Sequence, residues 1–341
     1  MKILNLIPKA AIALSLITAI TISSCSSSTE DVKSPAPQPS GPVNSGSLNL
    51  VAIDTAKVIK MNENGSSPVV VLNRNLNQNS YMSDFCFSPD GTKFIYVDQQ
   101  ASGVVPNFVK SIKLKIANID GTGDTDLFTA QNALQGSSIS SIRYCSDGKI
   151  FFAYKMATSN GSATALNYNI INPDGTGLTS ANAASYGEYF NISNDRRFYS
   201  NIASSTGNNG FRWYIYDKTL DGGAGGVHSQ VDFAQTMELS YSSISNDGKI
   251  AVLPYKDGNT IKLKIVDMST KVATDKTIIS GLAAGYTSFR FHLASDSVRG
   301  VLTITGQNYP KSKSYVFNTT TGVTSAPFEN NDENVIDVFA Y

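Results

Sequence analysis

Short runs of alternating apolar and polar residues, separated by tight turns, fill most of this chain. Phe87–Asp98 shows the unit: a run ends in Phe-Ser, a Pro-Asp-Gly turn follows, and an aromatic and β-branched run leaves it. Asp and Gly provide the local hydrogen bonding and the positive φ that a hairpin turn needs. The pattern therefore predicts an antiparallel hairpin at this position.

The hairpin recurs along the chain, roughly once every 50 residues. Its Asp serves as a marker and is found at Asp90, Asp147, Asp195, Asp247 and Asp296. A second element, Ile-Lys-Leu-Lys-Ile at Ile112–Ile116, returns identically at Ile261–Ile265. Its alternation of apolar residues with lysine predicts a strand with one buried face and one solvent-exposed face.

Each repeat divides into four short strands, with no helical periodicity between them. In the first complete repeat the strands are expected at Asp84–Ser88, Phe94–Asp98, Ile112–Ile119 and Thr125–Phe128. Four antiparallel strands per unit at this period are typical of propeller blades. The lack of amphipathic helices between strands argues against a parallel βαβ fold.

The two ends of the chain are expected to form a sixth blade together. Leu48–Ile53, Lys57–Met61 and Val69–Leu72 provide three strands, and the missing innermost strand is predicted at Val335–Tyr341. Pairing of the N- and C-terminal strands would close the ring without leaving a free sheet edge. We therefore predict an all-β, six-bladed β-propeller of four-stranded antiparallel blades over residues 48–341.

Residues 1–24 have the pattern of an export signal. Lys2 and Lys9 form a positively charged start before an apolar stretch over residues 10–22, which is shorter than the about 20 residues that a membrane span needs. Small residues then lead directly to Cys25, an arrangement that resembles the lipobox of bacterial lipoproteins, in which this cysteine is lipidated. An ordinary secretory signal is the alternative.

Residues 25–47 are rich in Ser, Pro and Gly, so we expect a disordered tether. Two acyl chains on Cys25 would suffice for stable anchoring. The N-terminal pattern thus predicts a bacterial cell-envelope protein, lipid-anchored in the outer membrane on its periplasmic or surface face.

Charge narrows the range of partners. Charged residues make up 16% of the chain, the net charge is zero, and no basic run stands out, so nucleic acid is not an expected partner. The expected partners are the membrane, through the lipid, and an envelope protein or glycan. We expect the protein to be a monomer.

The Phe-Ser-Pro-Asp-Gly module at 87–91, continued by Phe-Ile-Tyr-Val and later by Asn-x-Asp-Gly-Thr, resembles the TolB-type, WD-like propeller repeat. The resemblance covers residues 48–341 and implies the fold. Such repeats occur in binding proteins, protease propeller domains and lipoproteins alike, so it implies little about activity. TolB has an N-terminal α/β domain where this chain has a predicted tether, and its partnership with the peptidoglycan-associated lipoprotein is therefore not carried over.

Alignment on the marker Asp shows that the positions four and two residues before it are mostly small or polar, as crowded inner strands require. Cys86 and Cys145 belong to these positions and are predicted to be buried free thiols. Arg143 and His292 interrupt the row of small residues. At the mouths of the inner strands lie Asp84, Glu188, Glu238 and Arg290.

These six charged or ionisable residues predict a polar ligand-binding pocket at the channel mouth. The structural alternative is that Arg143 and His292 pair with neighbouring carboxylates or carbonyls. The sequence favours a non-catalytic protein- or glycan-binding module. A glycan lyase or hydrolase that uses carboxylates such as Glu188 and Glu238 is the alternative, and a structural role in the envelope is a third possibility.

No catalytic residue, cofactor or metal is expected. The chain has no Gly-x-Ser-x-Gly elbow, and His228 and His292 are its only histidines, too few for a His/Cys metal cluster. Alternating carboxylates at Asp120–Asp126 are compatible with calcium. However, the segment lacks the bidentate Glu of a calcium loop and coincides with a repeat turn.

Overall fold

The computed structural model describes residues 48–54, 56–74, 81–102, 109–134, 136–157, 163–181, 191–205, 210–219, 226–282, 286–306, 309–329 and 335–341. The predicted signal at 1–24, the predicted tether at 25–47, Cys25 and Glu188 lie outside these residues. The described part consists of strands and turns, and it contains no helix of the length and apolarity needed to cross a bilayer.

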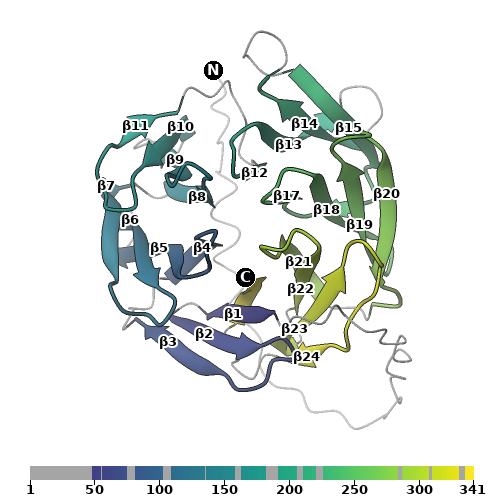
Figure 1. The fold of residues 1–341 in the computed structure, drawn as a ribbon, viewed down its shortest axis with the longest axis horizontal. Helices are drawn as coiled ribbons and strands as arrows, with labels where there is room; N and C mark the ends of the chain where they lie inside the picture. The colour runs from purple at the N-terminus through teal and green to yellow at the C-terminus, as the bar shows by residue number, and fades with distance from the viewer. Residues whose placement is uncertain are drawn as a thin grey trace, which may run out of the picture. The chain divides into compact units, whose positions relative to one another are not determined.

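Six antiparallel sheets form the blades of a propeller (Figure 1). Blade 1 contains, from the inside outward, β25 (Val335–Ala340), β1 (Asn49–Asp54), β2 (Lys57–Asn62) and β3 (Val69–Asn73). Blade 2 contains β4 (Tyr81–Phe87), β5 (Lys93–Ser102), β6 (Val109–Asn118) and β7 (Thr125–Ala133). Blade 3 contains β8 (Ser138–Tyr144), β9 (Ile150–Ala157), β10 (Ala163–Ile171) and β11 (Thr179–Ser180).

The second half of the ring repeats this arrangement. Blade 4 contains β12 (Asn191–Ile192), β13 (Phe198–Ser205), β14 (Gly210–Asp217) and β15 (Gly226–Ala234). In blade 5, β16 (Glu238–Leu239) and β17 (Ser243–Ile244) both pair with β18 (Ile250–Asp257), followed by β19 (Thr260–Asp267) and β20 (Ala273–Ile279). Blade 6 contains β21 (Tyr286–Leu293), β22 (Arg299–Gly306), β23 (Tyr309–Asn318) and β24 (Phe328–Glu329). The predicted six-bladed propeller is confirmed.

The ring closes through the two ends of the described chain. The last strand, β25, pairs antiparallel with β1, with Leu50 opposite Ala340 and Val51 opposite Phe339. Three strands from the start of the propeller and one from its end thus form a single sheet, as the sequence predicted. This pairing satisfies the backbone groups of a strand that would otherwise be a free edge.

The apolar core lies between the blades, in six clusters that each join two neighbours. Ile112 and Leu114 of β6, for example, pack with Ile139 and Ile150 of blade 3. Trp213 is completely buried between blades 4 and 5. Because both faces of every blade are covered, hydrophobic burial stabilises the ring as a whole rather than single blades.

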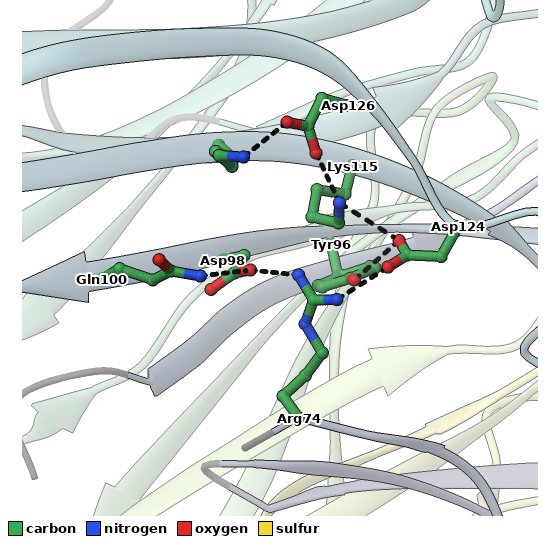
Figure 2. A network of polar contacts seen from close by, with 8 residues as sticks. Arg74, Tyr96, Asp98, Gln100, Lys115, Asp124 and Asp126 are labelled. Carbon is green, nitrogen blue, oxygen red and sulfur yellow. Dashed lines mark hydrogen bonds and ion pairs between the residues drawn. The ribbon is translucent and has the colours of Figure 1, made fainter. Parts of the chain in front are cut away.

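Lys115 of β6 shows a consequence of this stacking. The alternation in Ile112–Ile116 predicted that lysine would be exposed, but Lys115 is only 5% exposed. Its Nζ pairs with Asp126 and lies 3.5 Å from Asp124 Oδ1, in a polar network that also includes Arg74, just after β3 of blade 1 (Figure 2). The prediction is wrong here because the blades stack face to face, so this face of the strand is covered rather than open to water.

The marker Asp organises the turn that follows the innermost strand in the five blades that carry it. Asp90 Oδ1 accepts hydrogen bonds from Ser88 Oγ at 2.6 Å and from the Thr92 backbone N–H at 3.1 Å. These bonds, led by the one from Ser88, lower the pKa of Asp90 to about 2. The same Ser-to-Asp bond occurs within Ser193–Asp195 and Ser245–Asp247. The module found first in the sequence is thus a structural turn.

Candidate functional site

A cavity of about 540 Å³ lies among the innermost strands, and we refer to it as the channel cavity. Part of its lining comes from two rows of residues, six and four positions before the marker Asp, with the equivalent positions of β25. The first row provides Asp84, Ser141, Tyr241, Arg290 and Asp337. The second provides Cys86, Arg143, Asn191, Ser243, His292 and Phe339.

Four of the six predicted site residues line the channel cavity, namely Asp84, Arg143, Arg290 and His292. Glu238 of β16 is not part of its lining. The Glu238 side chain is mostly exposed, and its Oε1 accepts a hydrogen bond from Lys256 Nζ at 2.7 Å. Glu188 lies outside the described residues and stays a prediction.

Asp337 of β25 is the centre of a polar cluster in the channel cavity. Its Oδ2 accepts hydrogen bonds from His292 Nε2 at 2.8 Å and from Arg290 Nη1 at 3.2 Å, and its Oδ1 accepts the Val338 backbone N–H at 2.9 Å. Burial disfavours the carboxylate, but His292 and Arg290 outweigh this effect and lower the pKa of Asp337. His292 is therefore paired with a neighbouring carboxylate, as the structural alternative to a ligand-binding role predicted.

The two basic side chains of this cluster, His292 and Arg290, also pack against aromatic rings. The His292 ring lies 4.0 Å, centroid to centroid, from Phe339 of the closing strand. The Arg290 guanidinium lies 5.6 Å from the centroid of Tyr241, within the range of a cation–π interaction. Both basic groups are thus positioned from two sides.

Asp84 of β4 has a backbone φ of 44°, in a region that Asp tolerates better than most residues, at a register shift between Ser83 and Phe85. Its side chain is exposed to the solvent of the channel cavity, but the inner strands around the cavity surround it. Desolvation by these strands raises the pKa of Asp84 to about 6; Arg290 opposes this shift and Asp337 adds to it. This carboxyl group therefore changes charge close to neutral pH.

Arg143 of β8 extends from blade 3 to blade 5, where its Nη2 donates a hydrogen bond to the backbone oxygen of Ile244. Its Nε is buried and has no hydrogen-bond partner, and none of the described carboxylates forms an ion pair with the guanidinium. Burial lowers the pKa of Arg143, but guanidinium groups stay protonated in proteins. Arg143 is thus a cation without a counter-charge among the described residues.

The two described cysteines are free, as the sequence predicted. Cys145 is buried, whereas Cys86 is partly buried and lines the channel cavity. Burial raises the pKa of Cys86 to about 12 and that of Cys145 to about 11. Both are therefore neutral thiols at physiological pH, which makes them poor nucleophiles and poor metal ligands.

The acidic segment Asp120–Asp126 has structural partners for its carboxylates. Asp124 pairs with Arg74 and accepts a hydrogen bond from the Tyr96 hydroxyl at 2.8 Å, while Asp126 pairs with Lys115 (Figure 2). Within the described ranges, no group of three or more His, Cys, Asp or Glu side chains is arranged to hold a metal ion. The calcium interpretation of this segment thus has no structural support.

No family model matches this chain, and no curated protein is significantly similar to it. Among solved structures, TolB from Acinetobacter baumannii has a TM-score of 0.56 and 13% identity, covering 86% of this chain and 66% of TolB. A structure of the Nidogen/Laminin complex has a TM-score of 0.52 and 10% identity, covering 87% of this chain and 97% of the matched chain. The fold is that of a TolB-type propeller.

Identities this low establish the TolB-type fold alone. This chain spans 66% of the length of TolB from Acinetobacter baumannii, just under two thirds. An oligogalacturonate lyase in complex with manganese has a TM-score of 0.48 and 13% identity, covering 79% of this chain and 73% of the lyase. A similarity of that size does not bear on the activity of this propeller.

Sequence alignment missed Asp337 because β25 carries no marker Asp. The chain ends at Tyr341, where the marker turn of the other blades would begin. The backbone N–H of Tyr341 donates a hydrogen bond to the backbone oxygen of Asn49 in β1. In blade 2, the backbone N–H of Ser88 donates the equivalent bond to Lys93 of β5. Equating Tyr341 with Ser88 puts Asp337 level with Asp84. The level comes from the structure, and the signal in the sequence was that Asp337 lies within the predicted closing strand, Val335–Tyr341.

Proposed function

We propose that this protein is an envelope lipoprotein whose propeller binds another protein or a glycan in the channel cavity, without catalysis. The observation that carries the proposal is the cavity of about 540 Å³ among the innermost strands, lined by apolar residues together with Tyr, Ser, Asn and charged side chains. Cavities with a few convergent polar groups are the usual ligand sites of such folds. The TolB-type fold is consistent with a binding module.

The proposed location rests on residues 1–25 and on the fold. A charged start, a short apolar stretch and Cys25 after small residues support export and lipidation of this cysteine. Lipid anchoring in the outer membrane would present the propeller to envelope proteins and glycans. We propose a monomer without nucleic-acid partners.

The binding proposal is tested with the full-length protein, purified in mild detergent and immobilised. It is exposed to an envelope extract and, in parallel, to a panel of glycans. Tyr241→Ala removes an exposed aromatic side chain that lines the cavity, and we expect it to weaken binding at least tenfold. Leu178→Ala removes an exposed apolar side chain elsewhere and serves as the control. Failure to capture a ligand, or equal capture by both variants, would contradict the proposal.

One observation favours the enzymatic alternative, a glycan lyase or hydrolase. Asp84 and Asp337 both line the channel cavity, and the pKa of Asp84, about 6, is suited to a general acid. However, Asp337 Oδ2 already accepts hydrogen bonds from His292 and Arg290. Formation of new reducing ends or unsaturated sugars from envelope polysaccharides, lost in Asp84→Asn, would establish this activity.

A further inference from the structure

The charges of the channel cavity specify the ligand class more closely. We propose that the cavity binds a ligand through a carboxylate group, and that Arg143 is the residue that pairs with it. This inference rests on the proposed binding function and extends it from a location to a chemical class.

The cavity divides into a neutralised side and an uncompensated side. On the first, Asp337 is paired with Arg290 and His292. On the second, the described titratable groups that influence Arg143 are the thiols of Cys86 and Cys145. Since burial keeps both thiols protonated, they supply no negative charge. Among the described residues, the positive charge of Arg143 therefore remains uncompensated.

An uncompensated cation enclosed by protein is costly, because desolvation is not repaid by a partner. The hydrogen bond to Ile244 occupies Nη2, whereas the buried Nε is left without an acceptor. A guanidinium offers five N–H donors, most of which remain unassigned at this site. An anion in the cavity would neutralise the charge and accept hydrogen bonds from the terminal Nη groups of Arg143, since the buried Nε is shielded from the cavity.

The neighbouring groups favour a carboxylate over a phosphate. Asn191 Oδ1 accepts the Ile244 backbone N–H at 3.2 Å, which leaves its NH₂ group to donate beside Arg143, and the Ser243 hydroxyl lines the same cavity. One planar guanidinium with neutral donors matches a planar monoanion. A doubly charged phosphate usually requires several cations, but of the other cations that line the cavity, Arg290 is paired with Asp337 and Lys155 has an interaction partner of its own.

A carboxylate can come from an acidic sugar or from the C-terminus of a peptide. Calorimetry on the full-length protein in detergent distinguishes the two sources with matched probes. One arm compares a trisaccharide ending in glucuronic acid with its methyl ester. The other compares a tripeptide bearing a free C-terminal carboxylate with its C-terminal amide. We expect at least tenfold tighter binding of the charged form in one arm.

Arg143→Met tests the role of the guanidinium. We expect it to abolish the preference for the charged probe without lowering Tm, because it removes an uncompensated cation and keeps an apolar stem of similar length. Lys249→Met removes the same charge from a side chain that is 80% exposed outside the channel cavity, and should leave the preference intact.

Four results would overturn the inference. These are equal binding of the charged and neutralised probes, an unchanged preference in Arg143→Met, no binding of either carboxylate probe at millimolar concentration, and a lower Tm of Arg143→Met. The last result would assign Arg143 a structural role. An envelope ligand that binds in the cavity independently of Arg143 would uphold the proposed function while refuting its carboxylate chemistry. Binding of a carboxylate probe without capture of any envelope ligand would uphold the carboxylate chemistry while refuting the proposed function.

Discussion

His292 of β21 and Asp337 of β25 are joined by a 2.8 Å hydrogen bond between Nε2 and Oδ2, although 45 residues separate them in the chain. β21 belongs to blade 6 and β25 to blade 1, so the bond joins two neighbouring blades of the ring. The closing strand β25 is therefore held by a buried polar cluster on blade 6 in addition to its backbone pairing with β1.

Asp337→Asn should weaken this closure. The substitution removes the counter-charge of Arg290, and because Arg290 is partly exposed we expect a loss of about 1–3 kcal/mol in the free energy of unfolding. Urea denaturation measures the loss. Asp232→Asn, which breaks an exposed pair with Arg212 on blade 4, is the control and should have little effect. Equal effects of the two substitutions would refute a special role for Asp337.

Arg74→Gln should destabilise the contact between blades 1 and 2. Arg74 pairs with Asp98, whose side chain is fully buried and whose Oδ1 has no hydrogen-bond partner (Figure 2). Loss of the arginine leaves a buried carboxylate without its cation, so we expect a loss of about 2–4 kcal/mol. Thermal and urea unfolding test this expectation, and an unchanged midpoint would show that the network contributes nothing to stability.

Asp84→Asn should change how stability depends on pH. The pKa of Asp84 is about 6 in the folded protein against an ordinary 3.8, so the folded state binds this proton more tightly than the unfolded state. The resulting stabilisation is complete below about pH 4 and is lost as the pH rises through about 6. We therefore expect the variant to match the wild type at low pH and to have the higher Tm above about pH 6. A difference in Tm that is constant from pH 4 to 8 would contradict this prediction.

Cys86 and Cys145 should resist alkylation in the folded protein. Burial raises the pKa of both thiols to about 12 and 11, so the reactive thiolate is scarce at pH 7. Mass spectrometry after iodoacetamide treatment should show both residues unmodified in buffer and both modified in urea. Rapid labelling of Cys86 in buffer would show that its thiol is activated within the channel cavity.

Cys25→Ala should abolish membrane attachment if this cysteine is the lipidation site. Metabolic labelling with a fatty-acid analogue, followed by membrane fractionation, compares the variant with the wild type. We expect loss of the label and release of the protein from membranes. Continued retention in the membrane fraction would refute lipidation and favour another mode of attachment.

The candidate site was partly predictable, because the channel lining follows the repeat. Alignment on the marker Asp was sufficient to select Arg143 and His292, which interrupt a row of small residues. It also selected Glu238, which pairs with Lys256 instead of lining the cavity. Repeat alignment gives a residue's level along a strand, whereas the direction of its side chain depends on local bulges and on neighbouring blades.

The chain by itself determined the number of blades and the way in which the ring closes. Both follow from local signals, namely the Asp turns, the strand alternation and the three unpaired strands at the start of the propeller. Only the tertiary structure decided which charges meet. It paired Asp337 with His292 and Arg290, buried Lys115 in the network with Asp126, and left Arg143 without a counter-charge among the described residues. The physical reason is that these contacts join different blades and depend on burial and distance, which a one-dimensional pattern does not encode.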